Sequence, residues 1–244
     1  MTNNTDATAL ANAIAGSGVT ITNATLTSNT AAPSGTFTGG ANSVGFESGI
    51  ALTTGTTGCI PGPNNQGSCT GAGNITTLAF DFTTTTGEVF FNYVFGSEEY
   101  TQYAPSGFND RFDLLLNGVN IAQLPNGLGV VEINNVNCLT NSQFYRNNRD
   151  GEANQPPGCV NQNLDIQLDG LTVVLKATGL LQAGTNHFEF RIRDIGDSNL
   201  DSVVFIQAGS FGGTDPNNPA PEPASLALAG LGLAALAASR RRRA

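Results

Sequence analysis

The chain has 244 residues, a length that suits one domain with appended segments. Residues 1–220 carry six basic and eighteen acidic side chains. This balance excludes nucleic-acid binding through phosphate contacts, which needs clustered Lys and Arg, and it favours the attraction of cations such as Ca²⁺. Thirty glycines, together with abundant Asn and Thr, favour turns and strands over helices.

One short helix is expected near the N-terminus, at residues 6–16. Thr5 or Asp6 can cap its start, and Gly16 can end it. From residue 19 onward, short apolar or alternating segments separated by turn residues predict strands. The expected strands are residues 19–27, 49–53, 77–82, 88–95, 111–116, 119–122, 171–177, 186–193 and 202–208.

Three of these segments indicate how the strands pack. Residues 88–95 (EVFFNYVF) are apolar on both faces, which predicts a central strand covered on both sides. Asn117-Gly118 is typical of a two-residue type I′ hairpin. In residues 186–193, the apolar side chains alternate with charged ones, as in a strand with one buried face. The pattern predicts an all-β fold, an antiparallel β-sandwich that is jelly-roll-like, with one short N-terminal helix.

The domain organisation follows from changes in composition along the chain. Residues 1–17 are expected to pack on the domain, and residues 18–213 to form the sandwich. The polar segment 134–163 reads as an insertion on one face. Residues 214–220 form a flexible, Pro-containing linker, and residues 221–244 are a separate C-terminal signal.

The C-terminal signal has three parts in a fixed order. A short acidic motif precedes an uncharged apolar stretch, residues 224–239, and a basic end follows. A helix of sixteen residues reaches ~24 Å, against a hydrocarbon core of ~30 Å, so this transmembrane segment spans a bilayer only marginally. Basic flanks stay on the cytoplasmic side, which puts the preceding domain outside. The motif and the basic end are Pro221, Glu222, Pro223, Arg240, Arg241, Arg242 and Arg243.

This arrangement resembles the PEP-CTERM sorting signal of Gram-negative bacteria. The resemblance implies processing near residues 221–223 by exosortase, a membrane-embedded transpeptidase-like enzyme. It also implies passage through the inner membrane to the cell surface or the extracellular space. A plain tail anchor is the alternative. Residues 1–6 have no basic and no apolar signal-peptide region, so the true start is expected upstream, or the chain begins at its mature end.

The four cysteines form two close pairs, Cys59 with Cys69 and Cys138 with Cys159. Their even number, their loop context and export predict two local disulfides. In the chain-entropy model, each contributes roughly 2–3 kcal/mol. A zinc site is the rival, but the chain has no CxxC and one histidine, His187.

Three further segments carry a second resemblance. They are GSEEY at residues 96–100, FNDRF at 108–112 and DIGDSNLDSVVF at 194–205. Together with LANAIAGSGVTITNATL near the N-terminus, they resemble the choice-of-anchor L domain over roughly residues 8–211. That family consists of secreted bacterial β-rich domains joined to varied C-terminal anchors. Arg111 departs from it mildly, since an apolar residue is common there. The resemblance implies architecture and location but no activity.

The acidic residues of these segments lie at strand ends and allow three interpretations. If the ends meet at one rim, the carboxylates need a neutralising cation or arginines, and oxygen ligands suit Ca²⁺. The predicted calcium ligands are Glu98, Glu99, Asn109, Asp110, Asp194, Asp197 and Asp201. The structural interpretation is that these residues cap turns, with Arg191 or Arg193 paired to Glu98 or Asp110.

The third interpretation is a glycosidase pair, Glu98 or Glu99 with Asp110 or Asp113, whose carboxyls would lie ~5–9 Å apart. A Ser-His-Asp triad is disfavoured, because His187 falls on the polar face of a strand and no G-x-S-x-G motif exists.

The expected function is that of a secreted or cell-surface structural or adhesive protein of the biofilm matrix, not an enzyme, working with extracellular polysaccharide. A lectin-like carbohydrate-binding module, shaped by calcium, is the first alternative, and a glycan-acting hydrolase the second. An exposed aromatic shelf would favour the lectin, and a deep cleft with two facing carboxylates the hydrolase. The aromatic candidates are Tyr93, Tyr100, Tyr103 and Phe108.

Overall fold

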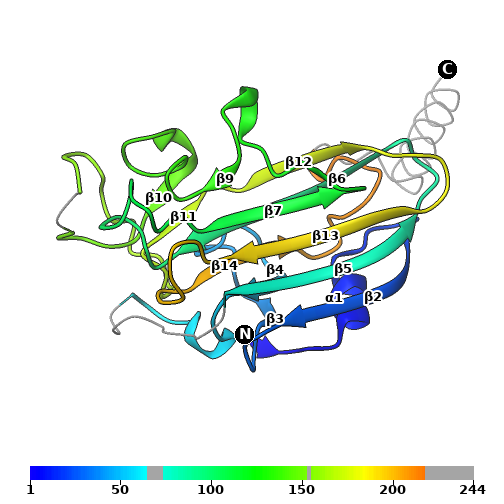
Figure 1. Ribbon diagram of the computed structural model, residues 1–244, viewed down its shortest axis with the longest axis horizontal. Helices are drawn as coiled ribbons and strands as arrows, with labels where there is room; N and C mark the ends of the chain where they lie inside the picture. Colours follow the sequence, from blue (N-terminus) through cyan, green and yellow to red (C-terminus); the bar gives the residue numbers. More distant parts are fainter. Residues whose placement is uncertain (65–73, 153–154, 218–244) are drawn as a thin grey trace, which may run out of the picture.

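The computed structural model describes residues 1–64, 74–152 and 155–217, and these form an antiparallel sandwich of two sheets. The first sheet has the order β1-β3-β4-β14-β6-β11-β10, and β12 also pairs with β6. The second has the order β2-β5-β13-β7-β8, and β9 also pairs with β7; β2, β5, β13 and β7 lie side by side in Figure 1. The expected all-β sandwich is confirmed.

The strands of the first sheet are β1 (Thr2–Asn3), β3 (Ser34–Thr38), β4 (Ser48–Thr53), β6 (Glu88–Ser97), β10 (Tyr145–Asn147), β11 (Gly170–Thr172), β12 (Leu175–Leu180) and β14 (Ser202–Gln207). Those of the second are β2 (Thr20–Ser28), β5 (Ile75–Thr83), β7 (Arg111–Leu116), β8 (Val119–Asn120), β9 (Val131–Glu132) and β13 (Asn186–Arg193). The helical elements are α1 (Ala7–Ile14) and the 3₁₀ turns η1 (Thr57–Cys59), η2 (Pro125–Gly127) and η3 (Ser142–Phe144).

The helix α1 forms where the sequence predicts it. Asp6 Oδ1 accepts hydrogen bonds from the backbone N–H groups of Thr8 and Ala9, at 2.9 and 3.1 Å. This cap satisfies two donors that a helix start leaves open. Leu10 and Ile14, one turn apart, are fully buried against the sandwich.

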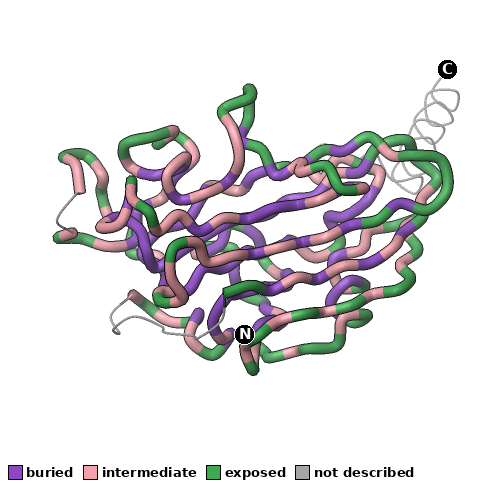
Figure 2. The backbone as a smooth tube through the Cα atoms, in the orientation of Figure 1, coloured by how far each residue is buried: buried purple, intermediate pink, exposed green. Residues whose placement is uncertain are grey.

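Aromatic rings fill the space between the two sheets. Phe80 of β5 and Phe190 of β13 face Phe91 of β6, with the Phe91 and Phe190 ring centroids 5.5 Å apart. Figure 2 shows the buried residues following the strands and the exposed ones following the loops. A second apolar cluster, which includes Val94 and Phe205, lies on the other face of the first sheet. The strand β6 is therefore covered on both sides, as predicted.

The hairpin between β7 and β8 is confirmed, because Asn117 and Gly118 both have positive φ, 49° and 83°. The strand expected at 171–177 is instead two strands, β11 and β12, which both pair with β6. Between them, the backbone N–H of Val173 donates to the carbonyl of Phe144 and so leaves the ladder. The short strands β1, β3, β9 and β10 were not predicted.

The disulfide between Cys138 and Cys159 is confirmed, with a Cα–Cα distance of 5.8 Å. It closes the long polar insertion. Cys59 is disulfide-bonded as well, but its expected partner Cys69 lies outside the described residues, so that pairing stays a prediction.

The beginning of the expected flexible linker is bonded to the domain. Lys176 Nζ lies 2.6 Å from Asp215 Oδ2, and just before the linker Gly212 exchanges backbone hydrogen bonds with Phe90. The apolar stretch 224–239 and the rest of the sorting signal lie outside the described residues. Within the described ranges, no helix is long and apolar enough to cross a bilayer.

Candidate functional site

Two of the places where the chain crosses between the two sheets carry the acidic motifs, and both lie at the same end of the sandwich. The segment after β6 leads to β7, and the segment after β13 leads to β14. Ser97, which ends β6, pairs with Ser202, which begins β14. Arg193, which ends β13, pairs with Arg111, which begins β7. Antiparallel pairing therefore brings both crossings, with the acidic residues they carry, to the end that lies on the left in Figure 1.

Hydrogen bonds join the two crossings. Asp110 Oδ1 accepts from the backbone N–H of Ile195 at 3.0 Å, and Oδ2 accepts from Ser202 Oγ at 2.7 Å. The backbone N–H of Glu98 donates to the carbonyl of Asp201 at 3.1 Å. The side chain of Asp110 thus acts as the acceptor that holds the end of β13 and the start of β14 against the start of β7.

Four carboxyl groups lie near one another here without surrounding one point, and we call this set, Glu99, Asp110, Asp194 and Asp197, the acidic end. Glu99 and Asp110 are each 1% exposed, and Glu99 Oε2 has no hydrogen-bond partner. Burial, together with the charges of Asp110 and Asp197, raises the pKa of Glu99 to about 9. Asp110 and Asp197 therefore lie within electrostatic reach of Glu99.

Asp194 is likewise a buried carboxyl group beside Asp110. Both of its carboxyl oxygens are buried, and the hydroxyl of Thr54 lies beside them. Burial raises its pKa to about 9, with a contribution from Asp110. The contact between these two carboxyls is a hydrogen bond only when one of them carries a proton. Burial also raises the pKa of Asp110, to about 6, but its bonds to Ser202 and Ile195 oppose this rise.

The arginines do not neutralise the acidic end. Arg193 and Arg111 both bond Asp113, and Arg191 bonds Glu189. The predicted pairing of Arg191 or Arg193 with Glu98 or Asp110 is therefore wrong. Alternation along β13 turns these side chains to the outward face of the second sheet, away from the crossings.

The seven predicted calcium ligands do not all meet. Asn109 Oδ1 accepts from the backbone N–H of Asn134 at 2.8 Å and so anchors the insertion. Glu98 and Asp201 lie together beside a hollow that has no room for a water molecule. Within the ranges that the structure describes, no group of three or more His, Cys, Asp or Glu residues is placed where it could hold a metal ion.

Sequence reasoning missed two neighbours of the cluster. Ser202 donates to Asp110, and its place beside Asp201 in the motif could have identified it. Thr54, the residue directly after β4, contacts Asp194, and no pattern in the sequence indicates this contact.

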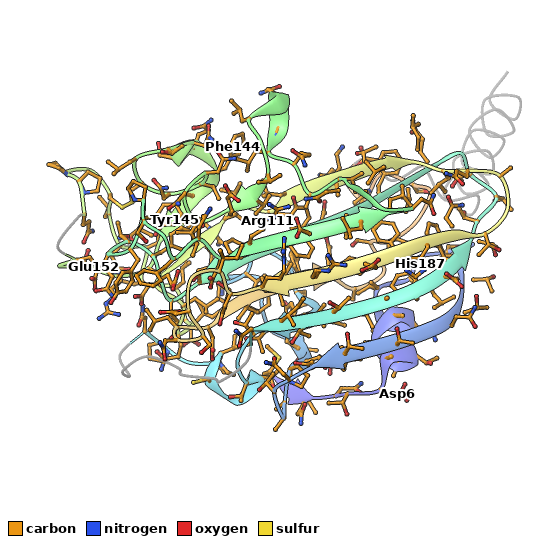
Figure 3. The ribbon with its side chains drawn as sticks, viewed as in Figure 1. Asp6, Arg111, Phe144, Tyr145, Glu152 and His187 are labelled. Atoms are coloured by element: carbon orange, nitrogen blue, oxygen red, sulfur yellow. A yellow bond between two sulfur atoms is a disulfide. The ribbon has the colours of Figure 1, made fainter. Side chains whose placement is uncertain are left out.

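Of the predicted glycosidase pairs, Glu99 and Asp110 are brought near each other, but each side chain is only 1% exposed, so neither is open to a sugar. Asp113 lies on the outward face with its two arginines, so it cannot pair with Glu98 or Glu99. His187 lies toward the opposite end of the second sheet from Arg111 (Figure 3), and its Nδ1 is 2.7 Å from Asp81 Oδ1. A surface cavity of about 460 Å³ is lined by Tyr145 and other residues of the insertion, and none of them is a carboxylate.

The candidate aromatic side chains pack in or against the interior of the domain and do not form an exposed shelf. Tyr93 and Tyr100 are fully buried. Tyr103 and Phe108 are half-buried and pack edge to face on each other, with ring centroids 5.5 Å apart. Among the residues that the structure covers, no large aromatic side chain is exposed.

A family model for the choice-of-anchor L domain matches residues 1–212, and one for the PEP-CTERM protein-sorting motif matches residues 219–243. The chain belongs to the choice-of-anchor L domain family. No curated protein and no solved structure matches it.

These matches define the destination of the protein. The sorting motif indicates export through the inner membrane of a Gram-negative bacterium to the cell surface or the extracellular space, and it implies recognition by exosortase. Both matched families are of the sorting or anchor type rather than catalytic.

Proposed function

We propose that this protein is a structural or adhesive component of the extracellular matrix and that it works with extracellular polysaccharide. The main support is the use of the family's acidic motifs. Asp110 holds the two crossings together through Ile195 and Ser202, and these residues do not line a cleft. In this domain the polar motifs and the aromatic side chains stabilise the fold itself. Such a domain suits a structural role, in which the folded protein acts as a building component.

A deletion strain of the producing bacterium tests this proposal. We expect loss of the protein to reduce cell-to-cell cohesion and matrix mass. The full chain should restore both, and a chain without residues 219–243 should restore neither, because it lacks the sorting motif. Unchanged cohesion and matrix mass in the deletion strain would overturn the proposal.

A carbohydrate-binding role is the second candidate, and the cavity of about 460 Å³ beside the disulfide of the insertion favours it. Its polar lining includes the exposed Gln162, whose amide group can bond sugar hydroxyls. Sedimentation with purified matrix polysaccharide separates the two roles. Binding that Gln162→Ala weakens, and that the exposed control Gln182→Ala leaves intact, supports a lectin. Equal binding by both variants speaks against this cavity.

A further inference from the structure

The strand β2 forms an open edge of the second sheet. It is the last strand of that sheet and, among the described residues, pairs only with β5, so its other side faces no strand (Figure 1). Half of the backbone N–H and C=O groups of an edge strand point outward, where they can pair with another chain. An edge of nine residues can therefore accept a further strand.

The other edges of the two sheets are short or charged. Among the described residues, the edge strands β1, β8, β9 and β10 have two or three residues each, and β12 carries the exposed Lys176. Short strands and lysines are means by which proteins prevent two sheet edges from pairing. The strand β2 (TITNATLTS) contains no charged residue and no proline, and its one interruption is a β-bulge.

The bulge divides β2 and leaves one half of it regular. The register with β5 shifts between Thr22 and Thr25. Within this shift, Asn23 has a φ of 53° and donates from Nδ2 to Asp81 Oδ2 at 2.8 Å. From Thr25 to Ser28 the pairing with β5 is continuous. This regular half is the part of the edge that a further strand can follow.

The distribution of charge selects a second copy of this chain as the partner. With eighteen acidic and six basic side chains in residues 1–220, two copies repel each other. No charged residue occurs between Asp6 and Glu47, and β2 lies within this stretch. Along this edge, two acidic copies can approach without bringing like charges into contact. A basic partner, in contrast, would be drawn to the acidic surfaces and not to this edge.

The side chains of the regular half are self-complementary. Thr25 and Thr27 are exposed on one face, and Ala24 and Leu26 pack partly buried against the core on the other. An antiparallel two-fold pairing centred on Leu26 places threonine opposite threonine and leucine opposite leucine, with the same face outward in both copies. Such pairs stabilise a sheet, and the partly exposed apolar side chains lose contact with water.

We propose that two copies of this chain pair antiparallel along residues 24–28 of β2, which joins their second sheets into one continuous sheet. One pair of strands buries little surface beside the roughly 1,200–2,000 Å² of a stable interface. The association is therefore weak and reversible, with a dissociation constant between about 1 µM and 1 mM. This inference does not depend on the matrix role proposed above, and it is tested on the purified protein.

Sedimentation velocity of the full chain in mild detergent tests the pairing at protein concentrations from about 1 µM to 1 mM. We expect monomer at the lower end of this range and dimer at the upper end. The double substitution Thr25→Lys/Thr27→Lys places like charges opposite each other across the two copies and should weaken dimerisation by about tenfold or more. Thr25→Glu/Thr27→Glu should weaken it similarly. The matched control is Thr178→Lys/Leu180→Lys, at two exposed positions of β12 with the same spacing, and it should dimerise like the wild type.

A mixture of the two charged β2 variants separates loss of pairing from damage to the fold. In the proposed register, the lysines of one copy face the glutamates of the other, so an equimolar mixture should again form dimers. The proposal is overturned if the wild type stays monomeric at the highest concentration, or if the mixture stays monomeric. It is also overturned if the lysine variant dimerises like the wild type, because the contact would then lie at another surface.

Discussion

Two charged regions of this domain use the same residue types in opposite ways. On the outward face of the second sheet, Asp113 is bonded by both Arg111 and Arg193, and Glu189 by Arg191. At the acidic end, four carboxyls lie near one another without an arginine or lysine partner among the described residues. The comparison teaches that composition does not decide whether a carboxylate is neutralised.

The difference follows from how each region is built. Residues on the outward face alternate along regular strands, so Asp113 of β7 lies directly opposite Arg191 of β13, one position along from the Arg111–Arg193 pair on the same face. The acidic end is made of loop residues whose neighbours come from the other crossing. There the hydrogen bonds to Ile195 and Ser202, rather than ion pairs, hold the chain.

The substitution Asp110→Ala breaks the acidic end and should have the largest effect. It removes the acceptor of two hydrogen bonds at a position that is 1% exposed. We expect a loss of about 3–4 kcal/mol in the free energy of unfolding, because the N–H of Ile195 and the hydroxyl of Ser202 stay buried without a partner. Urea denaturation at pH 7 with EDTA measures it. The control Asp197→Ala, at a half-exposed position, should lose less than about 1 kcal/mol; equal losses would contradict this role for Asp110.

The pH dependence of stability sharpens the comparison. Burial raises the pKa of Glu99 and Asp194 to about 9 and that of Asp110 to about 6, so the folded state holds more protons than the unfolded state above about pH 4. Their contribution is complete below that pH and is lost as the pH rises through the folded-state values. Because one unit of pKa difference is worth about 1.4 kcal/mol, we expect the unfolding free energy in EDTA to fall by at least several kcal/mol from pH 5 to pH 9.

Urea denaturation at several pH values measures this decline, and Glu99→Gln should flatten it. The outward-face variant Glu189→Gln should leave the slope unchanged, because Glu189 lies outside the acidic end. A stability that stays constant or rises across this range would contradict the burial of unneutralised carboxyls.

A pair of matched substitutions contrasts the two regions directly. Asp113→Asn removes the charge that Arg111 and Arg193 share and should cost about 1–2 kcal/mol. Asp194→Asn removes a like charge beside Asp110 and should stabilise the protein by about 1 kcal/mol at pH 9, where repulsion is greatest. Urea denaturation with EDTA at this pH measures both changes. If both changes have the same sign, the contrast between the regions is wrong.

Much of the fold could be predicted from local pattern. The alternation in β13, the apolar run of β6 and the Asn117-Gly118 turn each act over a few residues, and all three appear in the structure. The close spacing of Cys138 and Cys159 indicated their disulfide for the same reason. The break between β11 and β12 was missed, because it depends on a bond from Val173 to Phe144 in a distant segment.

By itself, the sequence determined the class of fold, the helix cap at Asp6, the disulfide of the insertion and the sorting motif, because each depends on residues near one another in the chain. Only the tertiary structure decided which carboxylates meet. The pairing of Ser97 with Ser202 and of Arg111 with Arg193 joins strand ends far apart in the chain. A period-two pattern states which face a residue occupies but not which strand end lies beside it, and burial by the neighbouring crossing sets the charge of Glu99 and Asp194.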